Sequence, residues 1–129
     1  IASDGTHTVE STDSEGHPRS TGTFPRVLGY YVRVLKLFSL EEAIRKMTSF
    51  PADIIGFKNR GRIQNGLPAD IVIFNPETIV DNATFEQPNL FSSGVVHVFV
   101  NGVAVLQNEE MTGKAPGKYL HRKEQLLND

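Results

Sequence analysis

The feature that most restricts the fold is a pair of β-rich runs, residues 95–100 and 103–107, on either side of Asn101-Gly102. Asn-Gly favours a two-residue type I′ turn, because both of its residues tolerate positive φ and the twist of this turn matches that of the strands. The flanking valines and phenylalanine favour extended backbone. The stretch therefore predicts a β-hairpin over residues 95–107.

Both faces of this hairpin are apolar. A further apolar strand is expected over residues 70–74, and a short one over residues 61–63 is followed by a turn at Asn65-Gly66. Strands that are apolar on both faces need to be covered on both, and their unpaired edges attract other strands. We expect the missing cover to come from an absent N-terminal segment or from another copy of the chain.

Helical spacing dominates the residues before Gly61. Apolar side chains recur every three to four residues from Val27 to Leu35, which predicts a helix within residues 24–38 that has Pro25 in its first turn. Ser39 and Glu42 form a capping-box pattern that opens a second helix over residues 40–47, and a short helix is expected within residues 51–57. Helices and strands are segregated along the chain, which favours an α+β fold.

Composition excludes several classes of partner and site. The net charge is −2 and no basic block occurs, so nucleic acid is not an expected partner. No apolar run approaches the ~20 residues that cross a bilayer, so no membrane is expected either. Cysteine is absent, which excludes disulfides and thiolate zinc sites and fits a reducing compartment such as the cytoplasm.

The side chain that most suggests a chemical role lies among the first residues. Ile1-Ala2 is interpreted as the end of a buried strand, and Ser3-Asp4-Gly5 as a turn that presents a carboxylate. A polar loop follows over residues 6–16, and then His17-Pro18-Arg19. Taken alone, an Asp before Gly is usually a turn residue and an isolated arginine a surface charge.

Together the motifs resemble a known family. SDG, HPR-x-x-GTFPRVLG-Y, GRI-x-x-G-x-x-ADIVIF, V-x-HV-x-VNG and TG-x-x-PG are similar to the C-terminal portion of N-acyl-D-amino-acid deacylases (D-aminoacylases), which are metal-dependent amidohydrolases. The resemblance implies a fragment: residues 1–60 would be the final strand, loop and helices of a TIM-like (β/α) barrel, and residues 61–129 part of a small β-sandwich plus a tail.

The resemblance also implies a chemistry, the hydrolysis of the amide bond of N-acyl-D-amino acids with zinc as cofactor. Asp4 would be the general acid/base and a ligand of a weakly held second metal ion, while Arg19 would bind the substrate α-carboxylate. His17 is grouped with the substrate-binding residues as one that shapes this loop. The His-x-His motif of the family has no counterpart here, so the main zinc ligands are expected upstream and the isolated chain is expected to be inactive.

Two other functions remain open at this stage. The chain could be a stand-alone β-sandwich module that associates through its strand edges and has no catalytic role. It could also belong to an amidohydrolase that opens cyclic amides, such as a hydantoinase or dihydroorotase. A cyclic amide offers no free carboxylate to Arg19, which argues against this last reading.

Overall fold

The computed structural model describes residues 1–5 and 16–121, so most of the expected polar loop, with His7, lies outside the described residues. The elements, in chain order, are α1 (Arg19–Arg26), η1 (Val27–Val34), α2 (Leu40–Met47), α3 (Ser49–Ile55), β1 (Ile71–Phe74), β2 (Val95–Val100), β3 (Val103–Gln107) and β4 (Glu110–Met111). The helices precede the strands along the chain and both kinds of element are present, which confirms the α+β prediction.

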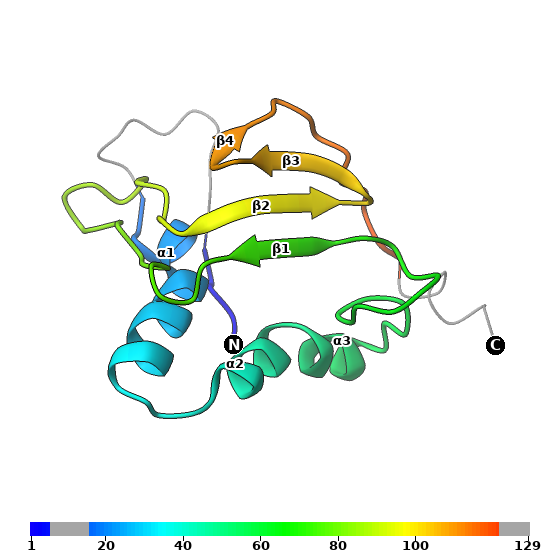
Figure 1. Cartoon of the computed structure of the whole chain (residues 1–129), viewed down its shortest axis with the longest axis horizontal. Coiled ribbons are helices and arrows are strands. Elements are labelled where there is room, and N and C mark those ends of the chain that lie inside the picture. Colours follow the sequence, from blue (N-terminus) through cyan, green and yellow to red (C-terminus); the bar gives the residue numbers. More distant parts are fainter. Residues whose placement is uncertain (6–15, 122–129) are drawn as a thin grey trace. The chain divides into compact units, whose positions relative to one another are not determined.

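The four strands form one antiparallel sheet in the order β1-β2-β3-β4 (Figure 1). Its centre is the predicted hairpin, and Asn101 and Gly102 both have positive φ, 48° and 78°, as a type I′ turn requires. The hairpin and the strand over residues 71–74 are therefore confirmed.

Two irregularities interrupt the pairing of the strands. Between β2 and β3, Val98 pairs with Leu106 but Phe99 pairs with Ala104, and a second shift separates Ile73 from Phe74 where β1 meets β2. Such a bulge leaves one residue unpaired and increases the local twist. The simple alternation of two apolar faces therefore does not hold across neighbouring strands, and all six residues of β2 are half-buried.

The expected strand over residues 61–63 is wrong. This stretch bends at Gly61, whose φ is 76°, and an added Cβ there would lie 2.8 Å from the carbonyl oxygen of Thr48. The next residue, Arg62, pairs with Asp53 of α3 at 2.8 Å. These contacts with the helical segment replace strand pairing. The turn at Asn65-Gly66 is present.

The first helix begins earlier than predicted and changes its pitch. α1 starts at Arg19, so Pro25 lies inside the helix and not in its first turn. Proline has no N–H to donate and its ring crowds the carbonyl four residues before it. The wider η1 follows at once as a π-helix, in which the Leu35 N–H donates to the Tyr30 carbonyl at 2.8 Å.

This change of pitch alters which side chains are buried. Val27 and Leu28 are buried as predicted, at 5% and 8% exposure, whereas Tyr31, Val34 and Leu35 are exposed. Spacing of three to four residues identifies one face only for turns of 3.6 residues. The five-residue hydrogen-bonded turns of η1 rotate the later residues away from that face.

The cap of α2 matches its prediction. The Ser39 hydroxyl accepts a hydrogen bond from the Glu42 N–H at 3.2 Å, and acidic residues fill the first turn while basic ones fill the last. This distribution of charge complements the helix dipole.

The part of the chain that the structure describes has no helix long and apolar enough to span a membrane.

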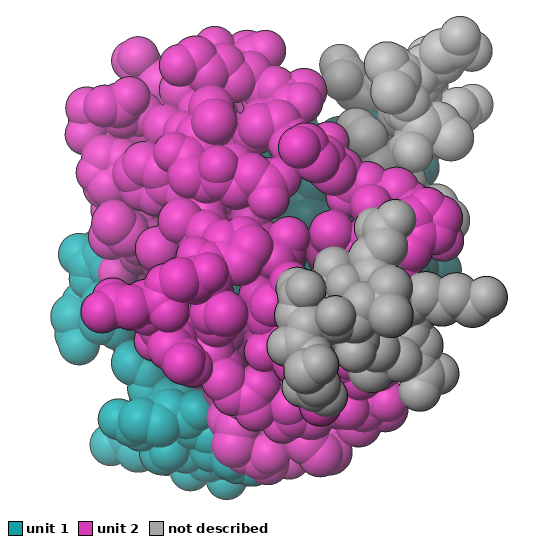
Figure 2. All heavy atoms as spheres, turned by 90° about the vertical axis from the view of Figure 1, so that its right-hand side faces the viewer, with its two compact units in different colours: residues 1–43, 75–94 teal, residues 44–74, 95–129 magenta. Residues whose placement is uncertain are grey.

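The chain forms two compact units, and each joins stretches that are distant in sequence. The first unit comprises residues 1–43 and 75–94, and the second comprises residues 44–74 and 95–129, coloured teal and magenta in Figure 2. The sheet lies in the second unit, and the candidate site residues lie in the first. The predicted domain boundary at residue 60 concerns a complete enzyme and stays a prediction.

Candidate functional site

Asp4 lies in a tight turn at the start of the first unit. Its φ is 50°, and the Gly5 N–H donates to the Ser3 hydroxyl at 3.2 Å. A Cβ on Gly5 would lie 2.9 Å from the Cα of Ser20, so glycine lets this turn approach the start of α1. Ile1 and Ala2 make no strand pairing in the described part of the chain, so the predicted strand end is not seen as a strand.

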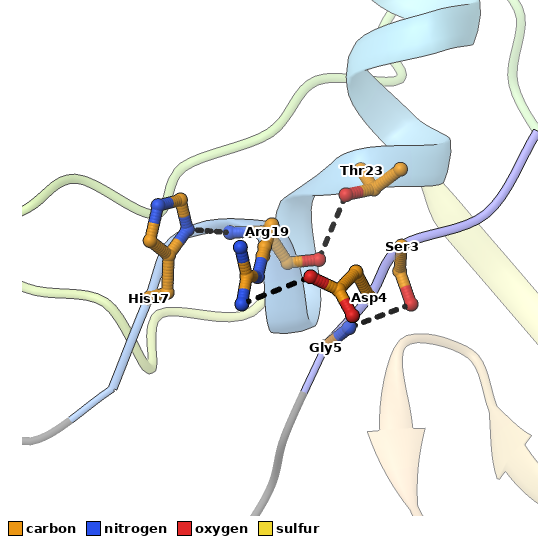
Figure 3. Close-up of polar contacts among 6 residues, drawn as sticks. All are labelled: Ser3, Asp4, Gly5, His17, Arg19 and Thr23. Carbon is orange, nitrogen blue, oxygen red and sulfur yellow. Dashed lines mark hydrogen bonds and ion pairs between the residues drawn. The ribbon is translucent and has the colours of Figure 1, made fainter.

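The turn brings Asp4 to Arg19, the first residue of α1. The Arg19 guanidinium lies 3.2 Å from the Asp4 carboxylate, and their side chains are 42% and 86% exposed (Figure 3). An exposed ion pair is screened by water and contributes little to stability. The contact therefore places the two groups together without locking them, and either group can exchange its partner for a ligand.

His17 lies on the backbone of Arg19 and not on its guanidinium. Its Nδ1 accepts a hydrogen bond from the Arg19 N–H at 3.1 Å (Figure 3). Pro18, which precedes the helix, makes no side-chain cap, so His17 satisfies one of the N–H groups that a helix start leaves unpaired. The rings of His17 and Phe85 meet edge-on, with their centroids 5.1 Å apart. The predicted substrate contact of His17 stays a prediction.

The far end of α1 carries a second ion pair, which sequence reasoning missed. Arg26 pairs with Asp81 at 2.9 Å, and the hydrogen bond and charge of Asp81 raise the pKa of Arg26 above its usual value. The Arg26 guanidinium also lies over the Tyr30 ring at 5.0 Å. Asp81 is 55 positions away in sequence, and no local pattern marks it as a partner. Tyr30 itself is exposed.

Metal ligands do not gather in the described residues. Within residues 1–5 and 16–121, no three His, Cys, Asp or Glu side chains lie close enough together to hold an ion. His97 accepts a hydrogen bond from the Asn108 N–H at 3.2 Å, and the His121 ring meets the Tyr119 ring edge-on. Because zinc in proteins is held by three or four such ligands, the described residues do not fit a zinc site by themselves.

Comparison with known proteins identifies the family of the chain. The family model described as Amidohydrolase family matches residues 1–106. The chain belongs to the amidohydrolase family. The predicted resemblance to the D-aminoacylase branch is also confirmed by individual relatives.

Three relatives from Alcaligenes xylosoxydans xylosoxydans are similar over most of this chain. A D-aminoacylase is 48% identical over 110 residues, which cover 85% of this chain and 23% of the relative. An N-acyl-D-glutamate deacylase is 46% identical over 85% of this chain and 22% of the relative. An N-acyl-D-aspartate deacylase is 43% identical over 84% of this chain and 22% of the relative. The chain therefore spans less than a quarter of the length of these amidohydrolases.

Solved structures agree with the sequence relatives. A D-aminoacylase crystal structure matches with a TM-score of 0.74 and 49% sequence identity. The match covers 77% of this chain and 21% of the D-aminoacylase chain. A second D-aminoacylase structure with the same TM-score and identity concerns the binuclear metal centre of that enzyme. The N-acyl-D-glutamate deacylase of Bordetella bronchiseptica, complexed with zinc and a phosphonate mimic of the tetrahedral intermediate, has a TM-score of 0.69 and 49% identity over 70% of this chain and 19% of that chain.

Proposed function

We propose that this chain supplies Asp4 and Arg19 to the active site of an N-acyl-D-amino-acid deacylase, which cleaves an amide to release a D-amino acid and a carboxylate. In the complete enzyme, residues 1–60 would close a catalytic (β/α) barrel and residues 61–129 would join a β-sandwich. The similarity to three deacylases, each acting on an N-acyl-D-amino acid, supports this assignment.

The contact between Asp4 and Arg19 is the observation that carries the proposal. In an N-acyl amino acid, only the α-carbon separates the amide nitrogen from the carboxylate. A residue that exchanges protons with the amide must therefore be a close neighbour of the residue that binds the carboxylate. Asp4 and Arg19, separated by 3.2 Å, meet this requirement.

Asp4 is the group that moves the proton in this proposal. A carboxylate beside the attacking water takes its proton as the oxygen bonds to the acyl carbon, and then gives that proton to the leaving nitrogen. The breaking C–N bond thus releases a neutral amine in place of a poor anionic leaving group. The turn around Gly5 fixes the backbone of Asp4, while the exposed carboxylate remains accessible to a substrate.

Arg19 orients the substrate. Its guanidinium is planar and permanently charged, and it offers paired N–H donors that match a carboxylate. On binding, the substrate carboxylate replaces Asp4 on Arg19, which frees Asp4 to face the amide. With the carboxylate and the acyl group both fixed, the side chain has one remaining direction at the α-carbon. Such a site selects one enantiomer.

Zinc belongs to the proposal for the complete enzyme only. A bound zinc ion activates water and polarises the acyl oxygen, and the zinc complex of the Bordetella deacylase is consistent with a metal requirement. The described residues do not assemble its ligands. The roles of Asp4 and Arg19 given above concern proton transfer and substrate binding.

A chimera tests both roles. This chain would replace the matching segment of the Alcaligenes D-aminoacylase, to which it is 48% identical. Asp4→Asn should abolish turnover and leave the zinc content nearly intact, with at most the weakly held second metal ion lost, because the proton carrier is removed while the fold is retained. Arg19→Lys should raise KM about tenfold for an N-acyl-D-amino acid, because a bidentate contact is lost.

The matched control is an amide substrate without the α-carboxylate. Arg19→Lys should leave the kinetics on this substrate unchanged. If turnover survives in Asp4→Asn, Asp4 is not the proton carrier, and if the two substrates respond equally to Arg19→Lys, Arg19 does not bind the carboxylate.

A further inference from the structure

The segment of residues 75–94 contacts the first helix along its length while having almost no regular structure of its own. In the described part of the chain, its pairing is limited to one isolated bridge, Val80 with Ser93. It lies beside α1 and η1 in the first unit (Figure 1). Ile79, at its middle, is 1% exposed. A segment with so little regular structure is ordered by what it packs against, which here includes the first helix.

One group of contacts holds the start of α1. The Thr21 hydroxyl lies 2.9 Å from the Leu90 carbonyl oxygen and donates a hydrogen bond to it. Pro88 beside it is fully buried, and Phe85 meets the ring of His17. These residues contact the first turn of the helix, which begins with Arg19, and His17 just before it.

A second group holds the end of α1. Asp81 binds Arg26 at 2.9 Å, and its side chain is only 13% exposed. The same residue lies against the middle of the helix, because a Cβ on Gly22 would approach the Asp81 Cβ to 3.3 Å. Beyond α1, the Arg33 guanidinium donates to the carbonyl oxygens of Pro76 and Ile79 at 2.9 and 2.8 Å.

We infer that segment 75–94 is a positioning element for substrate binding, in which Asp81, through Arg26, sets the placement of α1 and hence of Arg19. The inference rests on the proposed function of Arg19. α1 runs directly into η1, and helices in proteins gain most of their stability from tertiary packing, so the placement of α1 depends on what it packs against. Contacts at both ends hold it in place, and a bidentate contact of Arg19 with a carboxylate depends on that placement because both of its N–H groups must align with the two oxygens.

Kinetics of the chimera described above separate positioning from simple stabilisation. Asp81→Ala keeps the Cβ that packs near Gly22 and removes the carboxylate. KM for the N-acyl-D-amino acid should rise about tenfold while kcat changes less than about twofold, because a displaced Arg19 weakens carboxylate binding more than it affects the chemical step. The carboxylate-free amide should be turned over as before.

Three further variants sharpen the test. Asp53→Ala removes the equally short ion pair with Arg62 in the second unit and should leave both substrates unaffected. Asp81→Asn retains an acceptor oxygen for Arg26 and should restore part of the affinity. Arg26→Met combined with Asp81→Ala should be no worse than Asp81→Ala alone, since two partners of one contact are not additive.

The outcomes distinguish this inference from the function on which it rests. If Asp81→Ala lowers kcat/KM equally for both substrates, or if Asp53→Ala has the same effect, Asp81 is a structural residue only. If Arg19→Lys discriminates between the substrates and neither Asp81 variant does, the inference fails alone. If Arg19→Lys does not discriminate, the proposed function fails first.

Discussion

The two units of this chain are held together in different ways. In the unit of residues 75–94 and 1–43, side chains bind backbone or carboxylates that are 43 to 69 positions away, as in Arg33 with Pro76 and Thr21 with Leu90. In the unit that carries the sheet, the central contact is a hairpin between adjacent strands. A unit built on a few distant contacts can be damaged by one substitution, whereas a hairpin is supported along its whole ladder. The candidate site lies in the more vulnerable unit.

The largest effect is expected from Gly29→Ala in the first unit. A Cβ at this position would overlap the carbonyl oxygen of Ile79. Alanine improves helix propensity by about 1 kcal/mol, but overpacking against backbone costs up to about 3 kcal/mol, so the overlap dominates. We expect the free energy of unfolding to fall by about 2 kcal/mol in urea titrations of the 129-residue chain.

Gly117→Ala is the matched control, because nothing lies within 4 Å of an added Cβ there. Its unfolding free energy should not change. Equal stability of the Gly29 and Gly117 variants would mean that close contact between η1 and Ile79 does not hold the first unit.

A smaller effect is expected from Gly102→Ala in the second unit. Nothing crowds this position, but its φ of 78° is unfavourable for a residue with a side chain, at a cost of about 1 kcal/mol. Amide hydrogen exchange should become faster in β2 and β3. Gly66→Ala imposes a similar strain, with a φ of 86° and open space, and should leave exchange in these strands as it was. If both variants accelerate amide exchange in β2 and β3 equally, the turn at Asn101-Gly102 does not act locally on these strands.

The smallest effect is expected from Glu41→Gln at the start of α2. The pKa of Glu41 is lowered from its ordinary value of 4.5 by the N–H of its own backbone and then by the Ser39 hydroxyl. A lowered pKa in the folded state adds stability above the ordinary value and loses it as the pH falls through the folded value. The substitution should therefore lower Tm slightly at neutral pH and not at all in acid. A Tm difference that persists in acid would assign the effect to something other than this charge.

The sequence predicted best where the contacts are local. The hairpin of residues 95–107 follows from Asn101-Gly102 and its neighbours, and the cap of α2 follows from Ser39 and Glu42. The strand at residues 61–63 was predicted wrongly because Arg62 contacts Asp53, and the start of α1 because its stabilising partners lie in residues 75–94. The buried face of η1 was only partly predictable, since the spacing rule assumes an ordinary α-helix.

The candidate site shows the same limit. Asp4 and Arg19 were identified by the resemblance of their motifs, and the structure brings them into contact. His17 contacts the helix backbone, a position that its sequence neighbours do not reveal. Asp81 could not have been identified, because an aspartate in an irregular stretch carries no sign of an arginine 55 residues before it.

The turn at Asn101 also has a consequence for the order in which the chain folds. The Asn101 N–H donates to the Asp70 carboxylate at 2.7 Å, and the Asn101 side-chain amide donates to the carbonyl oxygen of Pro116 at 3.0 Å. Hairpins close in about 1–10 μs, well before contacts between distant residues are made. We expect β2 and β3 to form the nucleus on which β1 and the later residues of the second unit assemble.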